Sequence, residues 1–172
     1  MPREKIYVEG RKIETLAELL RPGLRFIVVG LNPSPVSVQA GHYYQGQLGR
    51  RIVFGRLQNS KIVGPLPKGR EDEVAFKKYG VGFADLVRRP SPRADSLTRA
   101  EKAQAVPGLL RRLGRTGDKP PLLFVFKDAF DAAAAALSEA GYTLHRMPPP
   151  YDPTKDVELA MARLRKKLGG QR

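Results

Sequence analysis

Three polar or proline-rich segments, 30–35, 85–90 and 148–153, contain residue types that could direct water at a bond. The side-chain amide of Asn32 can both donate and accept hydrogen bonds, so it could hold a water molecule without ionising. The carboxylate of Asp85 could polarise such a water molecule as a general base. Both residues also have plainer interpretations: an Asx turn before proline for Asn32, and a turn or helix cap for Asp85.

These segments must be brought together by the elements that precede them. Short apolar runs predict four strands, at 26–30, 81–84, 122–126 and 142–147. Capping boxes predict one helix that begins at Thr15 and ends before Pro22, and another that spans 98–113. Apolar spacing predicts helices around Ile52–Leu57 and over 156–168. A further helix is predicted over 129–140, with Asp128 as its cap. Strands that alternate with helices predict an α/β fold, in which a mostly parallel four-stranded sheet lies between two helical layers.

The predicted sheet explains why the three segments matter together. In an open parallel sheet, ligands bind beyond the carboxyl ends of the strands. The segments 30–35, 85–90 and 148–153 each follow a predicted strand. We therefore expect them to meet at one edge of a single domain that spans residues 1–172.

The charge of the chain indicates a polyanionic partner. Lys and Arg number 31 against 17 Asp and Glu, a formal net charge of +14. Such an excess favours nucleic acid, because neutralising phosphates releases counterions. A basic surface that serves solubility or thermal stability is the alternative. A membrane surface is disfavoured, because the cations are spread along the whole chain.

The composition also excludes several kinds of chemistry. The chain has no cysteine, which excludes disulfides, thiolate catalysis and cysteine-ligated metal clusters. With only two histidines, 103 positions apart, we expect neither a metal site nor a cofactor. The chain has no apolar run long enough to cross a bilayer and no signal peptide, so we expect a cytoplasmic, nucleoid-associated protein.

Four blocks of the chain resemble the mismatch-specific branch of the uracil-DNA glycosylase superfamily. Gly30-Leu-Asn-Pro-Ser34 is similar to the family's first motif, usually Gly-Ile-Asn-Pro-Gly. The other similar blocks are Gly41-His-Tyr-Tyr44 with Gly49-Arg-Arg51, Gly80–Ser91 with Asp95–Glu101, and Phe126–Phe130. Their order and spacing agree with the family from about residue 25 to residue 168.

The sequence departs from this pattern at three positions. Pro149 stands where the second motif, Asn-Pro-Ser-Gly, begins, and proline offers neither a side-chain donor nor an N–H. Ser34 replaces the second glycine of the first motif, and Gly49 replaces an asparagine. These replacements bear on base preference, on the wedge that enters DNA and on the rate.

The resemblance implies a monofunctional DNA N-glycosylase that flips a nucleotide out of double-stranded DNA. Such an enzyme, acting as a monomer in base excision repair, hydrolyses the N-glycosidic bond of uracil or another deaminated base. In this scheme Asn32 positions the water molecule and Asp85 assists as a general base. No cofactor or metal is implied.

The resemblance also implies contacts for other residues. Tyr44 would stack on the flipped base, with Tyr43 as the substitute if the register slips by one. The predicted base-contacting residues are Gly30, Leu31, Ser34, His42, Tyr43 and Tyr44. The predicted DNA-contacting residues are Ser37, Arg50, Arg51, Arg88 and Lys127, together with a wedge of Pro149, Pro150, Tyr151 and Lys155. For each side chain the alternative is packing in the fold or solvation at the surface.

Two other functions compete with the enzyme. A non-catalytic protein that recognises flipped or damaged bases in DNA would explain the missing asparagine of the second motif, although Asn32 argues for catalysis. An unrelated nucleotide-binding α/β protein would need a glycine-rich phosphate loop after the first strand, which segment 31–34 does not supply.

Overall fold

The computed structural model describes residues 3–170 and contains a central sheet of four parallel strands. In sheet order these are β4 (Val81–Asp85), β3 (Phe26–Gly30), β5 (Leu122–Phe124) and β6 (Leu144–Arg146). All four lie where the sequence predicts strands. The predicted three-layer α/β fold is therefore confirmed, with a sheet that is parallel throughout.

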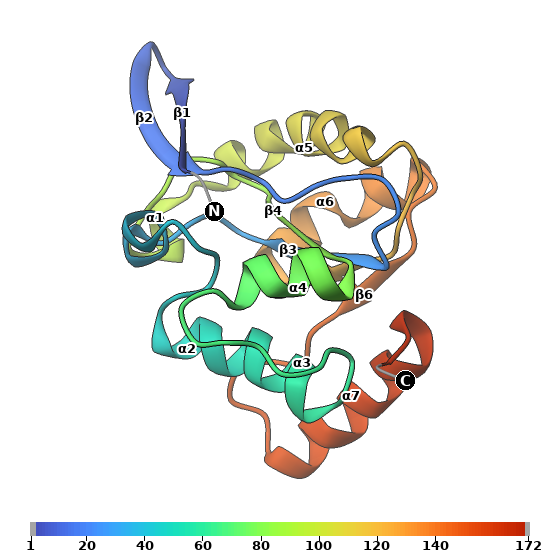
Figure 1. Cartoon of the computed structure of the whole chain (residues 1–172). Helices are drawn as coiled ribbons and strands as arrows, with labels where there is room; N and C mark the ends of the chain where they lie inside the picture. The colour runs from blue at the N-terminus through green and yellow to red at the C-terminus, as the bar shows by residue number, and fades with distance from the viewer. Residues whose placement is uncertain (1–2, 171–172) are drawn as a thin grey trace.

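Helices cover both faces of the sheet (Figure 1). The side chains of Ile27 and Val29 pack with α5 (Arg99–Leu113) and α6 (Lys127–Glu139). Because side chains alternate along a strand, Phe26 and Val28 point to the opposite face. There they pack with α4 (Glu71–Tyr79), α7 (Thr154–Leu168) and the helical segment that ends in α3 (Arg56–Asn59). Two apolar clusters thus hold the sheet in place.

The helix predicted around Ile52–Leu57 is present as a composite. It runs through α2 (Gln47–Gly49), the π-helical segment η1 (Arg50–Gly55) and α3. The wider π turn is rare and occurs often at functional sites. The helices α1 (Pro35–Ala40) and α4, and the short 3₁₀ segments η2 (Ala94–Ser96) and η3 (Gly114–Thr116), were not expected. Within residues 3–170, no helix is both long enough and apolar enough to span a bilayer.

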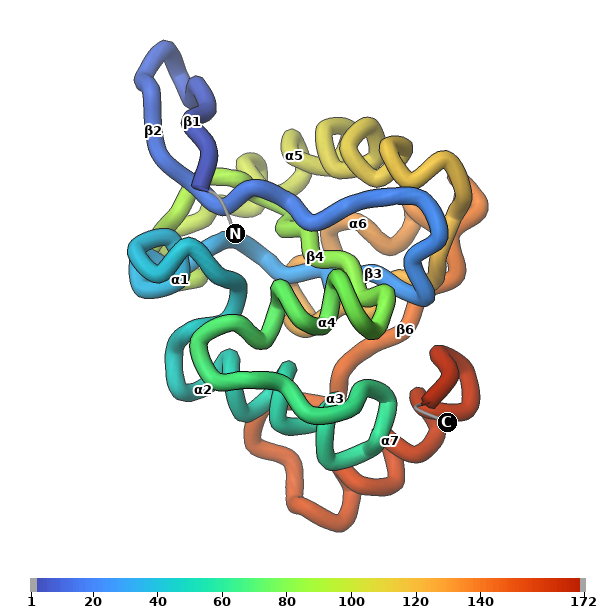
Figure 2. The backbone as a smooth tube through the Cα atoms, in the orientation of Figure 1, coloured from blue at the N-terminus to red at the C-terminus, as the bar shows by residue number. Residues whose placement is uncertain are grey.

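The helix predicted to begin at Thr15 is wrong. The chain instead forms an antiparallel hairpin of β1 (Arg3–Val8) and β2 (Arg11–Leu16), which projects from the body in Figure 2. The Thr15 hydroxyl donates to the backbone carbonyl of Arg88 rather than capping a helix. Tertiary contacts at the base of the hairpin thus override the local capping signal.

One other predicted cap is wrong and one is confirmed. The hydroxyl of Thr98 accepts a hydrogen bond from the Glu101 N–H at the start of α5, as predicted. The helix α6 begins at Lys127, so Asp128 lies in its first turn and Phe126 takes the cap position without a side-chain hydrogen bond.

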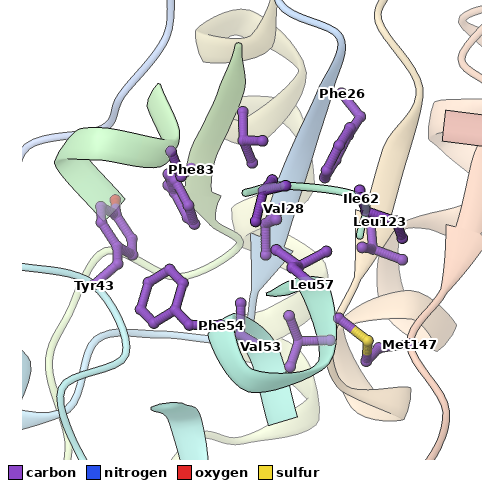
Figure 3. Packing of buried hydrophobic residues seen from close by; sticks show 14 of the residues in the cluster. Phe26, Val28, Tyr43, Val53, Phe54, Leu57, Ile62, Phe83, Leu123 and Met147 are labelled. Atoms are coloured by element: carbon purple, nitrogen blue, oxygen red, sulfur yellow. The ribbon is translucent and has the colours of Figure 1, made fainter. Parts of the chain in front are cut away.

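Aromatic packing on one face of the sheet connects the core to the carboxyl ends of the strands. Figure 3 shows Tyr43, Phe54 and Phe83 grouped beside β4. The rings of Tyr43 and Phe83 stack with centroids 5.5 Å apart, and those of Phe54 and Phe83 are 6.0 Å apart. This packing fixes the segment that carries Tyr43 and Tyr44.

Replacing Leu109 of α5 by alanine should destabilise the protein by about 2–5 kcal/mol, because Leu109 is fully buried and the change leaves a cavity. Leu159→Ala is the matched control: Leu159 is 53% exposed on α7 and should cost no more than about 0.5 kcal/mol. Urea unfolding measures both values. Equal losses would show that the α5 face is not the packed face.

Candidate active site

A pocket of about 640 Å³ opens beyond the carboxyl ends of β3, β4 and β5. Its apolar lining comes from Leu16, Leu31, Pro33, Leu48, Pro92, Ala94 and Phe126, and its polar lining includes Asn32, Ser34, Ser37, Tyr43, Tyr44, Asp85, Ser91, Lys127 and Asp128. The predicted segments 30–35 and 85–90 therefore meet here, the second through Asp85. Segment 148–153 contributes no residue to this lining.

The side-chain amide of Asn32 is held in one orientation at the pocket wall. Its Nδ2 lies 2.9 Å from the Arg89 carbonyl oxygen and 2.7 Å from the Ser91 hydroxyl oxygen. A carbonyl oxygen can only accept, so the group that faces it must be the NH2. Both amide hydrogens are thereby used. The Oδ1 atom, to which no group within residues 3–170 donates, remains to accept a hydrogen bond from a ligand or from water.

Ser91 is a site residue to which the sequence analysis assigns no role of its own. Its hydroxyl donates to the Arg93 carbonyl at 2.9 Å and is therefore left as an acceptor for Asn32. Its backbone N–H donates to the Pro33 carbonyl. The preceding Arg89 is anchored by a bidentate pair with Glu101, at 2.9 and 2.8 Å. The start of α5 thus fixes the loop that orients Asn32.

Gly30 lets two polar side chains meet at the floor of the pocket. A Cβ atom at Gly30 would collide with Asp85 Oδ1 and would lie 2.6 Å from Tyr44 Oη. The Tyr44 hydroxyl is buried and has no hydrogen-bond partner within residues 3–170. The carboxyl of Asp85 is 3% exposed and faces the pocket. The floor therefore offers a ligand two polar groups close together, both on the side of Gly30 where a Cβ atom would lie.

Burial controls the protonation of Asp85. Loss of solvation, reinforced by the negative charge of Glu18, raises the pKa of Asp85 to about 8, against its ordinary value of 3.8. At neutral pH the carboxyl is therefore mostly protonated. The prediction that Asp85 acts as a general base is disfavoured on this ground, since a neutral acid donates a hydrogen bond instead of accepting a proton.

A buried ion network lies behind Asp85. The Arg112 guanidinium donates to Glu18 Oε1 at 2.7 Å and to the Asp85 backbone carbonyl at 2.7 Å. Arg88 contacts Glu4 and the Leu16 carbonyl, and its side chain is 14% exposed. The sequence predicts that Arg88 contacts DNA. These internal partners favour a structural role for it, joining β2 of the hairpin to the loop after β4.

Tyr43 and Tyr44 have different environments. Tyr43 is buried and stacked on Phe83, so it belongs mainly to the core. Tyr44 is only partly buried and takes φ 55°, a backbone conformation that costs energy for an aromatic residue. A Cβ atom at Gly49 would lie 3.0 Å from Tyr44 Cβ, so Gly49 makes room for it. Stacking of Tyr44 on a base stays a prediction.

The first two residues of the α4 acidic turn clamp the segment that carries Tyr44. Asp72 accepts from the Tyr43 N–H at 2.8 Å and lies 2.8 Å from His42 Nδ1. Glu71 contacts Arg50 Nε at 3.3 Å. His42 and Arg50, predicted to bind base and DNA, do not line the pocket. Their contacts favour a structural role in shaping its wall.

The other predicted residues at the pocket differ in whether their polar groups already have partners within the protein. The Ser34 hydroxyl caps α1 by accepting from the Ser37 N–H at 3.2 Å, and the Ser37 hydroxyl accepts from the Gln45 N–H at 3.1 Å. Leu31 adds apolar wall. Lys127 is exposed at the rim and pairs with Asp131 one turn along α6. Among these residues, Lys127 is the most exposed.

The proline-rich loop is held by Arg56, a residue that sequence reasoning missed. A proline has no N–H, so segment 148–150 has no backbone donors of its own. The buried Arg56 guanidinium supplies them, donating to the carbonyls of Pro148, Pro149 at 2.8 Å, and Pro150 at 3.5 Å. The loop thereby presents Tyr151, 83% exposed, to solvent.

Arg51 covers the ring of Tyr151, with its guanidinium carbon 5.6 Å from the ring centroid. Pro149 and Lys155 are also exposed, and Pro150 is half-buried. The predicted wedge residues therefore lie on an accessible loop and on the first turn of α7 that follows it, outside the lining of the Asn32 pocket. Their contact with DNA stays a prediction.

Within residues 3–170, no group of three or more His, Asp or Glu side chains is arranged to hold a metal ion. A scan against protein-family models finds no match for this chain.

Replacing Asp85 by asparagine should make the protein more stable at high pH. Because the folded pKa of about 8 lies above the ordinary value of 3.8, the folded state retains a proton that the unfolded chain releases. Wild-type stability is therefore lost as the pH rises between these values, on the order of 1 kcal/mol per pH unit. The amide introduced by Asp85→Asn cannot ionise, so the advantage of this variant should grow from pH 5 to pH 8 and then level off.

Urea unfolding of both proteins at pH 5, 7 and 9 measures this advantage. Asp95→Asn is the control, because Asp95 is exposed and its pair with Arg93 should contribute less than about 1 kcal/mol at any pH. An advantage of Asp85→Asn that stays constant with pH would mean that Asp85 is ionised throughout.

Proposed function

We propose that the protein is a monofunctional DNA N-glycosylase that hydrolyses the bond between sugar and base at a flipped, deaminated nucleotide. The observation that carries this proposal is the Asn32 amide: both of its hydrogens are bonded within the loops, and its Oδ1 is left at the wall of the pocket. The resemblance of segment 30–34 to the first motif of the mismatch-specific glycosylases supports the same assignment. Uracil or another deaminated base is the proposed leaving group.

The pocket suits a flipped base in size and lining. A volume of about 640 Å³ accommodates a nucleobase with its sugar, and apolar side chains such as Leu31 and Phe126 cover the ring faces. In the proposed reaction Asn32 Oδ1 accepts a hydrogen bond from water. The water oxygen then bonds to C1′ as the N-glycosidic bond breaks, and the base leaves with the electron pair of that bond. The proton that the water loses neutralises the departing base, so the products are the C1′ hydroxyl of an abasic sugar and the free base.

Negative charge develops on the departing base, and two groups at the pocket floor can donate to it. Protonated Asp85 and the unpartnered Tyr44 hydroxyl both lie beside Gly30. Donors aimed at a developing anion lower the barrier, because they need no reorganisation at the moment of reaction. The resemblance implies that the asparagine of the second motif contacts the base or leaving group, and Pro149 stands at its position here. In this proposal Asp85 and Tyr44 make that contact instead.

Charge and shape outside the pocket favour DNA as the carrier of the base. The net charge of +14 suits a polyanion. The exposed Tyr151, with Pro149 on the same loop and Lys155 on the first turn of α7, provides an aromatic and basic tip to fill the gap that base flipping leaves. Lys127 lies at the rim of the pocket, where it would meet a phosphate.

One observation favours a second candidate, a non-catalytic protein that binds flipped or damaged bases. Among the described residues that line the pocket, the two carboxyl groups are Asp85, which is mostly neutral at pH 7, and Asp128, which lies at the rim. Binding would then use the same pocket and the same exposed loop without hydrolysis.

Asn32→Ala should lower the rate of base release by about 100-fold or more, because the water molecule loses its anchor. Labelled duplexes that contain uracil, hypoxanthine, xanthine or thymine opposite each normal base are incubated with the protein, and alkali then reveals abasic sites. Gln104→Ala on the exposed face of α5 is the matched control and should retain full activity. Tight binding of a damaged duplex without any abasic product in the wild type would support the non-catalytic candidate.

Ser91→Ala should lower kcat roughly tenfold and leave KM nearly unchanged, because it frees the Asn32 amide to rotate while the pocket walls remain. Ser91→Thr keeps the hydroxyl and should restore most of the rate. A rise in KM with unchanged kcat would assign Ser91 to substrate binding instead of to the orientation of Asn32.

A further inference from the structure

A second pocket, of about 660 Å³, lies between the helical segment that ends in α3 and the C-terminal helix α7. Figure 1 shows these two elements side by side beneath the sheet. The lining consists of Arg51, Arg56, Asn59, Ser60, Asp152, Thr154, Val157, Glu158, Met161, Ala162, Arg165 and Lys166. It shares no residue with the pocket that contains Asn32. The function proposed above therefore leaves this second pocket unexplained.

Cations without carboxylate partners gather in this pocket. Among the described residues, none of the four lining cations Arg51, Arg56, Arg165 and Lys166 has a carboxylate oxygen within 4.0 Å. Other exposed cations, such as Arg70 and Lys77, share a carboxylate at 3.0 and 2.7 Å. Asp152 and Glu158 also line the pocket, so its four cations exceed its carboxylates by two.

Two of these cations are held close together at an energetic cost. Arg56 is 6% exposed, and the proline-loop carbonyls fix its guanidinium. Burial lowers the pKa of Arg56, and the neighbouring charge of Arg51 lowers it further, against a smaller opposing effect of Asp152. Like charges that a fold keeps together favour a bound anion, because the anion relieves their repulsion.

The remaining lining gives the pocket a polar mouth and an apolar floor. Thr154 begins α7, and its cap residue Pro153 supplies no side-chain hydrogen bond, so the hydroxyl and N–H of Thr154 are donors at the N-terminus of a 15-residue helix. Val157 and Met161 line the floor. Arginine forks and a helix N-terminus both match the geometry of phosphate oxygens.

We propose that the pocket between α3 and α7 is a phosphate-binding site, distinct from the pocket that contains Asn32. Arg51 and the N–H and hydroxyl of Thr154 would contact the phosphate, while Arg56 sets the positive field at the back. Arg165 and Lys166, eleven or more residues further along α7, lie toward the other end of the pocket. The phosphate would come either from a free nucleotide or from the DNA backbone that runs past Tyr151. The proposal holds whether or not the protein is a glycosylase.

A charge reversal at Arg51 tests the site. Calorimetric titration with inorganic phosphate, at constant ionic strength and pH, should show saturable binding to the wild type. Arg51→Glu should weaken that binding at least about tenfold, through loss of a charge-assisted contact. The matched control is Arg163→Glu, which makes the same charge change at an exposed position of α7 outside the pocket. It should bind phosphate like the wild type.

Equal loss in both variants, or no saturable binding by the wild type, would overturn the proposal, because the effect would then belong to the general basic surface. The neutral variant Arg51→Gln should also lose binding, and thermal unfolding shows that each variant is folded. When Arg51→Glu loses phosphate binding and Arg163→Glu does not, an undamaged duplex identifies the source of the phosphate. A larger loss of duplex affinity in Arg51→Glu than in Arg163→Glu assigns the site to the DNA backbone. Equal duplex affinities of the two variants assign it to a free phosphorylated ligand.

Discussion

Two hydrogen bonds from one amide join the loops that follow β3 and β4. Asn32 donates to the Arg89 carbonyl and to the Ser91 hydroxyl, so the first loop cannot move without the second. The second loop is anchored in turn to α5 through the pair of Arg89 with Glu101. The chemistry proposed for the pocket requires this fixed amide, because a freely rotating side chain would present its oxygen only part of the time. The packing of α5 on the sheet thereby fixes the direction in which Asn32 Oδ1 points.

The floor of the same pocket shows how burial changes the role of a side chain. A carboxyl group on the surface would be ionised and would accept protons. Beneath Tyr44 and beside Glu18, Asp85 retains its proton to about pH 8. The proposed function therefore relies on donors at the floor and on an acceptor at the wall. This division is chemically suited to a reaction in which water attacks on one side and an anion leaves on the other.

The local sequence signals that predicted the fold were those that tertiary contacts reinforce. The run Phe26–Gly30 is apolar at every position because both faces of β3 are covered, and Thr98 with Glu101 forms a true cap. Thr15 carried a similar signal but lies in a hairpin strand, because the Arg88 carbonyl competes for its hydroxyl. The meeting of Asn32 and Asp85 followed from strand topology. Arg88, His42 and Arg50 make internal contacts with residues far along the chain. A local sequence pattern does not contain those partners, so it does not predict the contacts.

The three consecutive prolines of segment 148–150 have a consequence for how this loop could change over time. Their carbonyls are held by a guanidinium more than ninety positions earlier in the chain, at Arg56. The loop is therefore not a portable module: transplanted alone into a related scaffold, it would lack the donor that shapes it. Evolutionary exchange of this tip would require the loop and the arginine-bearing helix to change together.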